Sequence, residues 1–231
     1  MNKLLSFITL LAGVIAFSLP VQATTLTFDL DYEFSGATPP AGIAPWITAT
    51  FDDTFGDANT VRLTMSASNL VGAEFIDDWL FNFDDTLDPT QLTFAIVGMP
   101  GSTPNNINTG VNAFKADGDG FFDIQFDFPP PPGAFDDKFT SGETVVYDII
   151  YTSAINASSF DYNSAPGGGA GTYHSAAHIQ GIGPNDNDSG WIGDGGGLIP
   201  GGVEVPEPAT MLLFGSGLVG FALKSKKRFK K

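Results

Sequence analysis

The chain has 231 residues, with 10 Lys and Arg against 26 Asp and Glu, and a formal net charge of -16. This length favours one domain with processing segments at its ends. Nucleic acid is excluded as a partner because phosphate binding needs clustered cations. The sequence contains no cysteine, which excludes thiol catalysis, thiolate metal sites and disulfides, so packing must hold the core together.

The first 23 residues have the pattern of a secretory signal peptide. Lys3 supplies a positive start, residues 4–19 are mostly apolar, and Pro20 precedes small residues that end at Ala23. This order predicts export and cleavage after Ala23 by signal peptidase. An N-terminal membrane anchor is the alternative, but the apolar run is short for one.

Residues 24–203 are dominated by alternation of apolar and polar side chains, which predicts β-strands. Strands are expected at 26–34, 61–67, 75–83, 92–96, 122–128 and 145–151, and loops at 100–109, 129–133 and 165–171. One wet, acidic face on each strand fits antiparallel sheets. We therefore predict an all-β domain, an antiparallel jelly-roll-like β-sandwich.

The segment DGDGFFD offers a candidate metal site. Asp117, Asp119 and Asp123 place carboxylates near turn-forming glycines, as a calcium loop does. However, Lys115 stands where a full loop would supply an oxygen ligand, and no Glu closes the loop. Two interpretations stay open: a calcium site completed by ligands from elsewhere, and an acidic hairpin turn leading into the strand at 122–128. No other cofactor is expected.

Two further sets of polar residues are candidates for catalysis or metal binding. Adjacent aspartates occur at 52–53, 77–78, 84–85 and 136–137, but a glycosidase needs two carboxylates that converge, and neighbours on a strand point to opposite faces. His174 and His178 could hold zinc with Asp186 or Asp188. The glutamate of the HExxH motif is missing, so a structural role is the alternative. We assign no catalytic residue and expect a protein that is not an enzyme.

The tryptophans suggest a possible ligand contact. Trp79 lies in an alternating stretch and is expected in the core, whereas Trp191 lies in the polar, Gly-rich stretch NDNDSGWIGDGG. An exposed ring in a loop can stack on a sugar, which makes Trp191 a candidate ligand-binding residue. Packing in the core is the alternative.

The last 28 residues, 204–231, contain three parts in order. Val205, Pro206, Glu207 and Pro208 come first, and the apolar residues 209–223 follow. The cations at the end are Lys224, Lys226, Lys227, Arg228, Lys230 and Lys231. A helix over 209–223 would rise about 22 Å, and lysine stems can extend its reach, so we predict a membrane-spanning helix with its cations in the cytoplasm. A buried core helix is the alternative.

This tail resembles the PEP-CTERM sorting signal of Gram-negative bacteria. The resemblance implies recognition by exosortase, an integral membrane cysteine transpeptidase, and a precursor anchored in the inner membrane. It further implies a mature protein at the cell surface or outside the cell, associated with exopolysaccharide or biofilm. The body resembles a group of exported PEP-CTERM proteins through FDDTFG, EFIDDWLFNFD, KADGDGFFDIQFDFP, AAHIQGIG and SGWIG. That second resemblance implies fold and location, and no chemistry.

Three functions are therefore compatible with the sequence, in descending order. The first is a non-enzymatic surface or matrix protein sorted by exosortase. The second is a calcium-dependent, lectin-like module that uses Trp191 to bind glycan. The third is a secreted glycan hydrolase built on the same sandwich, which would need two facing carboxylates.

Overall fold

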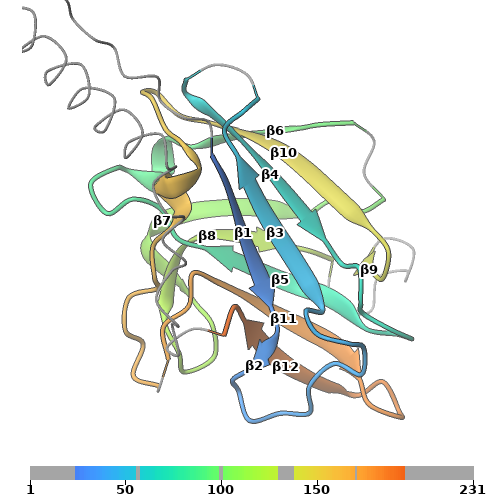
Figure 1. Ribbon diagram of the computed structural model, residues 1–231. Coiled ribbons are helices and arrows are strands. Elements are labelled where there is room, and N and C mark those ends of the chain that lie inside the picture. The colour runs from blue at the N-terminus through green and yellow to red at the C-terminus, as the bar shows by residue number, and fades with distance from the viewer. Residues whose placement is uncertain (1–23, 56–57, 99–100, 130–137, 170, 196–231) are drawn as a thin grey trace, which may run out of the picture.

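The computed structural model describes residues 24–55, 58–98, 101–129, 138–169 and 171–195. They form two antiparallel β-sheets packed face to face, so the predicted β-sandwich is confirmed, while its jelly-roll winding stays a prediction (Figure 1). The signal peptide with Ala23 and the tail at 204–231 lie outside the described residues. Within the described ranges, no helix has both the length and the apolar character needed to cross a membrane.

The first sheet has five strands. Its order is β1 (Thr25–Leu30), β3 (Ile47–Asp52), β4 (Thr60–Ser66), β10 (Thr144–Ile150) and β6 (Thr93–Ile96). Burial alternates along β3 and β4, because one face of each strand meets the core and the other meets solvent. Arg62 and Asp148 lie opposite each other on the wet face and form a bidentate ion pair, at 2.8 and 3.0 Å.

The second sheet has seven strands. Its order is β2 (Tyr32–Glu33), β12 (Asp188–Gly193), β11 (Ser175–Ile182), β5 (Phe75–Phe81), β8 (Phe121–Asp127) and β7 (Asn106–Lys115), and β9 (Phe139–Thr140) also pairs with β5. Two short 3₁₀ turns, η1 (Pro89–Gln91) and η3 (Ala157–Phe160), complete the described elements.

Three predictions about local structure need correction. The strand expected at 26–34 divides between the sheets, because β1 ends at Leu30 and the chain then pairs with β12 through β2. The loop expected at 100–109 is wrong from Asn106 onward, where β7 begins. Trp191 lies in strand β12, in register with His178 of β11, and not in a loop.

Aromatic rings fill the space between the sheets. Phe51 from the first sheet stacks on Phe160 at 4.4 Å between ring centroids and meets Phe81 of the second sheet edge-on at 5.4 Å. Trp79 is fully buried beside Phe81 and Phe139, as predicted for a core residue. Large rings bury much apolar area, and edge-on and offset contacts add to that gain, so these rings join the two sheets.

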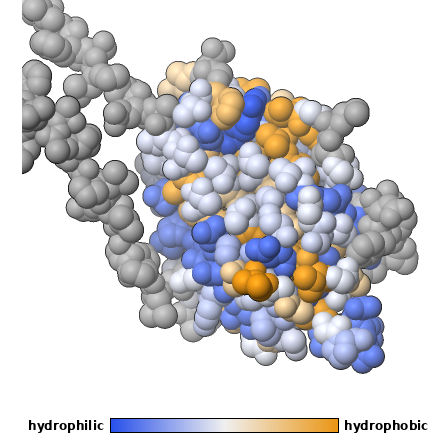
Figure 2. All heavy atoms as spheres, turned by 45° about the vertical axis from the view of Figure 1, so that its right-hand side comes forward, coloured by the Kyte–Doolittle hydropathy of each residue, from blue (hydrophilic) through white to orange (hydrophobic). Residues whose placement is uncertain are grey.

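A second, smaller apolar cluster lies on the other side of the second sheet. Leu80 and Ala176 lie opposite each other on β5 and β11 and contact Phe122 and Tyr173. Because neighbours on a strand point to opposite faces, Leu80 points away from the core that receives Trp79 and Phe81. The outer face of this sheet is therefore partly covered by the chain itself. On the molecular face in Figure 2, the remaining hydrophobic residues form small separate groups among hydrophilic ones.

Candidate functional site

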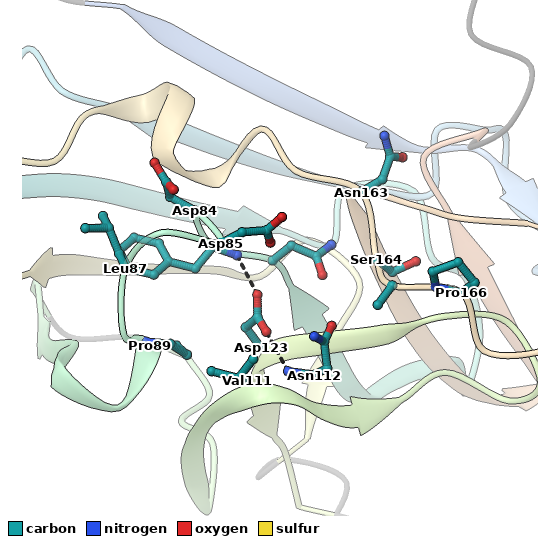
Figure 3. A pocket seen from close by; sticks show the side chains of 13 residues that line it. Asp84, Asp85, Leu87, Pro89, Val111, Asn112, Asp123, Asn163, Ser164 and Pro166 are labelled. Atoms are coloured by element: carbon teal, nitrogen blue, oxygen red, sulfur yellow. Dashed lines mark hydrogen bonds between the residues drawn. The ribbon is translucent and has the colours of Figure 1, made fainter.

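A cavity of about 440 Å³ opens beyond the end of β5 (Figure 3). Its lining residues are Asn82, Phe83, Asp84, Asp85, Leu87, Pro89, Val111, Asn112, Asp123, Asn163, Ser164, Ala165 and Pro166. The lining residues thus include three with carboxylates, three with amides and one with a hydroxyl, together with aliphatic side chains. Ligand sites commonly combine apolar walls with a few fixed polar groups in this way, in volumes of roughly 300 to 1,000 Å³.

Asp84 shapes the upper rim of the cavity in the view of Figure 3. Its Oδ1 accepts hydrogen bonds from the hydroxyl and the backbone amide of Thr86, at 2.7 and 2.8 Å. This local turn is typical of aspartate, and it directs the chain from β5 toward Pro89. The Thr86 hydroxyl is the main reason why the pKa of Asp84 lies below its usual range. Asp84 is therefore a carboxylate at neutral pH.

Asp123 is the buried carboxylate of the site, with 7% of its surface exposed. One oxygen accepts from the backbone amide of Phe83 at 3.0 Å, and the other from that of Asn112 at 2.7 Å. Asn112 reaches it because β7 bulges: the pairing with β8 jumps between Thr109 and Phe114, and Asn112 takes a left-handed φ of 49°. Burial raises the pKa of Asp123, and the two hydrogen bonds oppose that rise.

Asn82 and Ser164 connect the lining of the cavity to the segment around Tyr173. The amide nitrogen of Asn82 donates to the carbonyls of Tyr173 and His174, both at 3.0 Å, and only 2% of the residue is exposed. Ser164 Oγ accepts from the amide of Tyr173 at 3.1 Å. Gly120 has a φ of 88°, and a Cβ there would meet Ser164 Oγ at 2.2 Å, so only glycine fits beside this wall.

The segment DGDGFFD contains the turn between β7 and β8 and the start of β8, as expected for an acidic hairpin. Asp117 has a left-handed φ of 48° in this turn. The mostly buried Asp119 accepts a 3.4 Å hydrogen bond from the amide of Gly171, while Asp123 faces the cavity. The three carboxylates therefore have different neighbours, and calcium binding by them stays a prediction.

We expect weak calcium binding that depends on Asp117, Asp119 and Asp123, because carboxylates are the ligands calcium prefers. Calorimetry in millimolar calcium measures it. Replacing Asp119 with Asn should reduce the heat several-fold, whereas replacing Asp186, in the turn between β11 and β12, should not. An unaltered heat in Asp119→Asn, or no heat in the parent protein, would remove this proposal.

A different set of residues has metal-binding geometry on the outer face of the second sheet. Among the described residues, Asp77, Asp78 and His178 are the group whose ligand atoms all lie within 4.8 Å of one another. The sequence suggested that adjacent aspartates on a strand face opposite ways. That inference is wrong here, because the β5–β11 register shifts between His178 and Ile179 and turns both carboxylates toward His178.

Neighbouring amides hold this group in place. Gln180 donates to Asp77 at 2.6 Å and Gln125 to Asp78 at 2.7 Å, and burial raises the pKa of Asp78. An imidazole and two carboxylates are a donor set that zinc accepts. The predicted zinc partners Asp186 and Asp188 are not in this group.

Trp191 is half-buried and lies on the same outer face of the second sheet. Its ring stacks on His178 with centroids 5.0 Å apart and packs against the second apolar cluster. Pairing places Asn106, Asp127, Asp78, His178 and Trp191 in one row across five strands. Ligand binding by Trp191 stays a prediction, now on a strand surface.

His174 forms a separate pair with Asp194. Its Nδ1 lies 2.7 Å from the Asp194 carboxylate, and this hydrogen bond raises the pKa of His174 above its usual value. When folding raises the pKa of a histidine, the resulting stabilisation is fully present at pH values below the unfolded pKa of about 6.5. It is lost as the pH rises through the folded pKa. We therefore expect stability to fall as the pH rises above about 6.5.

Replacing Asp194 with Asn tests this expectation. The variant should lose most of that pH dependence, because an amide cannot stabilise the imidazolium through charge. Urea unfolding of both proteins between pH 5 and 9 measures the difference. Parallel pH profiles for the two proteins would show that the pair does not supply the effect.

Comparison with known families adds one match. A family model described as the PEP-CTERM protein-sorting motif matches residues 204–228. The resemblance of the tail is thereby confirmed: the chain carries a PEP-CTERM sorting motif, which indicates an exported protein that is anchored at the membrane and then processed, and which implies exosortase as the processing partner. No curated protein and no solved structure matches the chain. The match covers the tail, so what the sandwich does must be argued from its own geometry.

Proposed function

We propose that this chain, which carries the PEP-CTERM sorting motif, is a non-enzymatic surface or matrix protein of a Gram-negative bacterium that associates with exopolysaccharide in a biofilm. The motif at residues 204–228 carries the proposal, because it directs the exported protein to exosortase. The acidic body supports it: of ten cationic residues, the segment 24–203 keeps only Arg62, Lys115 and Lys138. Such a charge favours solubility outside the cell.

The hydrogen bonding in the cavity supports binding over catalysis. A glycosidase needs a protonated carboxyl opposite a second carboxylate. Burial raises the pKa of Asp123, but both of its oxygens accept from backbone amides, and an oxygen of Asp84 accepts from Thr86, so these hydrogen bonds hold the two carboxyl groups in fixed positions. Carboxylates fixed in this way serve as hydrogen-bond acceptors for a hydroxylated ligand. This arrangement favours a carbohydrate-binding module, calcium-dependent or not, as the second candidate function.

Cell fractionation tests the proposed association. The chain, tagged between signal peptide and body, is expressed in its producing bacterium and in a strain unable to make exopolysaccharide. We expect the processed protein to sediment with the polysaccharide in the first strain and to appear in the medium in the second. A strain without exosortase is the control and should keep the precursor in the membrane. The same distribution with and without exopolysaccharide would contradict the proposal.

A further inference from the structure

We propose that the cavity around Asp85 and Asp123 binds a sugar unit that bears a free amino group. This inference rests on the proposed function, since the ligand would be a unit of the exopolysaccharide. It goes further by assigning the site and the charge of the sugar. Three features of the cavity support it: its shape, the fixed positions of its buried polar groups and its negative charge.

The cavity has the size and polarity that a sugar ring requires. Its volume of about 440 Å³ lies within the range of small-ligand sites. In Figure 3, Asp85 lies on one side and Asp123 and Asn112 on the opposite side, while the carboxylate of Asp84 points away from them at the rim. The lining also has apolar surface, which aliphatic side chains supply, among them Leu87, Pro89 and Val111. A sugar presents hydroxyl groups at its edge and C–H groups on its faces, and this lining can meet both.

The buried polar groups are held in position before any ligand arrives. Asn82 and Asp123 are both more than nine-tenths buried, yet both line the cavity. Backbone amides fix the two oxygens of Asp123, and backbone carbonyls fix the nitrogen of Asn82. Each oxygen of a carboxylate can accept more than one hydrogen bond. A ligand therefore meets oriented acceptors and does not have to order them, which favours affinity.

The charge of the lining selects among sugars. The lining contains Asp84, Asp85 and Asp123, and no Lys, Arg or His. The charge of Asp85 already contributes to the raised pKa of Asp123, so the two carboxylates repel each other. An ammonium group relieves that repulsion and donates charge-assisted hydrogen bonds, whereas a uronic acid adds to it. The site thus favours an amino sugar over a neutral one and excludes an acidic one.

Calorimetry on the full-length chain in zwitterionic, sugar-free detergent tests this inference. The probes are the β1,4-linked dimer of glucosamine, its N-acetylated form and the dimer of glucuronic acid. We expect the glucosamine dimer to bind at least ten times more tightly than the acetylated form, and the glucuronic acid dimer not to bind. The affinity for the glucosamine dimer should fall as the salt concentration rises, because salt screens the charges.

Variants locate the binding site. Asp85 is exposed, so Asp85→Asn should fold normally and weaken glucosamine-dimer binding about tenfold. Asp186→Asn removes an equal charge from a distant turn and should bind like the parent. Asp123→Asn, checked for folding by circular dichroism, should also weaken binding. Equal affinity for the amine and its acetylated form, an unaffected Asp85→Asn, or calcium binding in the cavity in place of sugar would overturn the inference.

The fractionation experiment separates this inference from the proposed function. If Asp85→Asn loses the glucosamine dimer and also leaves the polysaccharide fraction, both stand. If the protein sediments with polysaccharide but does not bind the glucosamine dimer, the assignment of the site fails and the proposed function stands. If neither occurs, both fail.

Discussion

Replacing Pro206, Glu207 and Pro208 with alanine is expected to leave nearly all of the protein as a full-length precursor in the membrane fraction. Proline disfavours helix, and an extended peptide is the form that a processing enzyme can bind. Alanines favour helix and would let the apolar segment at 209–223 continue into the motif. Immunoblots of membrane and medium fractions, with a tag in the body, measure the ratio of precursor to released protein.

A matched control uses a proline outside the motif. Pro200→Ala alters the same residue type a few positions upstream and should be processed like the parent protein. Release of the triple variant at the parent rate would show that the match at 204–228 does not act as a sorting signal.

Replacing Trp79 with alanine should cost about 3 to 5 kcal/mol of unfolding free energy, the range for large aromatic residues removed from a core. Trp79 is fully buried between Phe81 and Phe139, and its indole donates to Ser175 Oγ at 2.9 Å. Because domains have about 5 to 15 kcal/mol of stability, this loss is a large share of the total. Urea denaturation followed by circular dichroism measures it.

Trp191→Ala is the matched control for this prediction. The same change at a half-buried ring should cost less than about 2 kcal/mol, since the ring keeps contact with solvent in the native state. Trp79→Phe should lie between the two, because it retains most of the apolar volume but loses the indole N–H. Equal losses at Trp79 and Trp191 would contradict the described core.

Alternation identified several of the strands that have one buried face, but it missed β3, whose burial also alternates. Val61, Leu63 and Met65 of β4 are buried while their neighbours are part-exposed, as the pattern predicts. Strand β11 escaped prediction because most of its residues are buried on both faces, which removes the alternation. Its small residues Ser175, Ala176 and Ala177 also gave no hydrophobic signal.

Glycine misled the prediction around Trp191. The stretch NDNDSGWIGDGG has the composition of a loop, yet Gly190 and Gly193 belong to strand β12. A Cβ at Gly193 would lie 2.7 Å from the ring of Tyr173, so this glycine allows close packing and does not mark a turn. Composition alone does not distinguish these two uses of glycine.

The cavity could be predicted only in part. The sequence drew attention to Asp123 and to the pair at 84–85, but it did not connect them. Folding brings residues 82–85, 111–112 and 163–166 together around Asp123, and those contacts join segments far apart in the chain. The bulge in β7 that points Asn112 at Asp123 has no sequence signal beyond Gly110. Long-range placement of this kind requires the structure.

The intact mass of the protein collected outside the cell tests the sorting account most directly. We predict a mass that lacks the apolar segment and the cationic end of residues 209–231, with processing at or next to the PEP motif, and no such product from cells without exosortase. An extracellular protein that retains Lys231, or an identical product from cells without exosortase, would contradict the account.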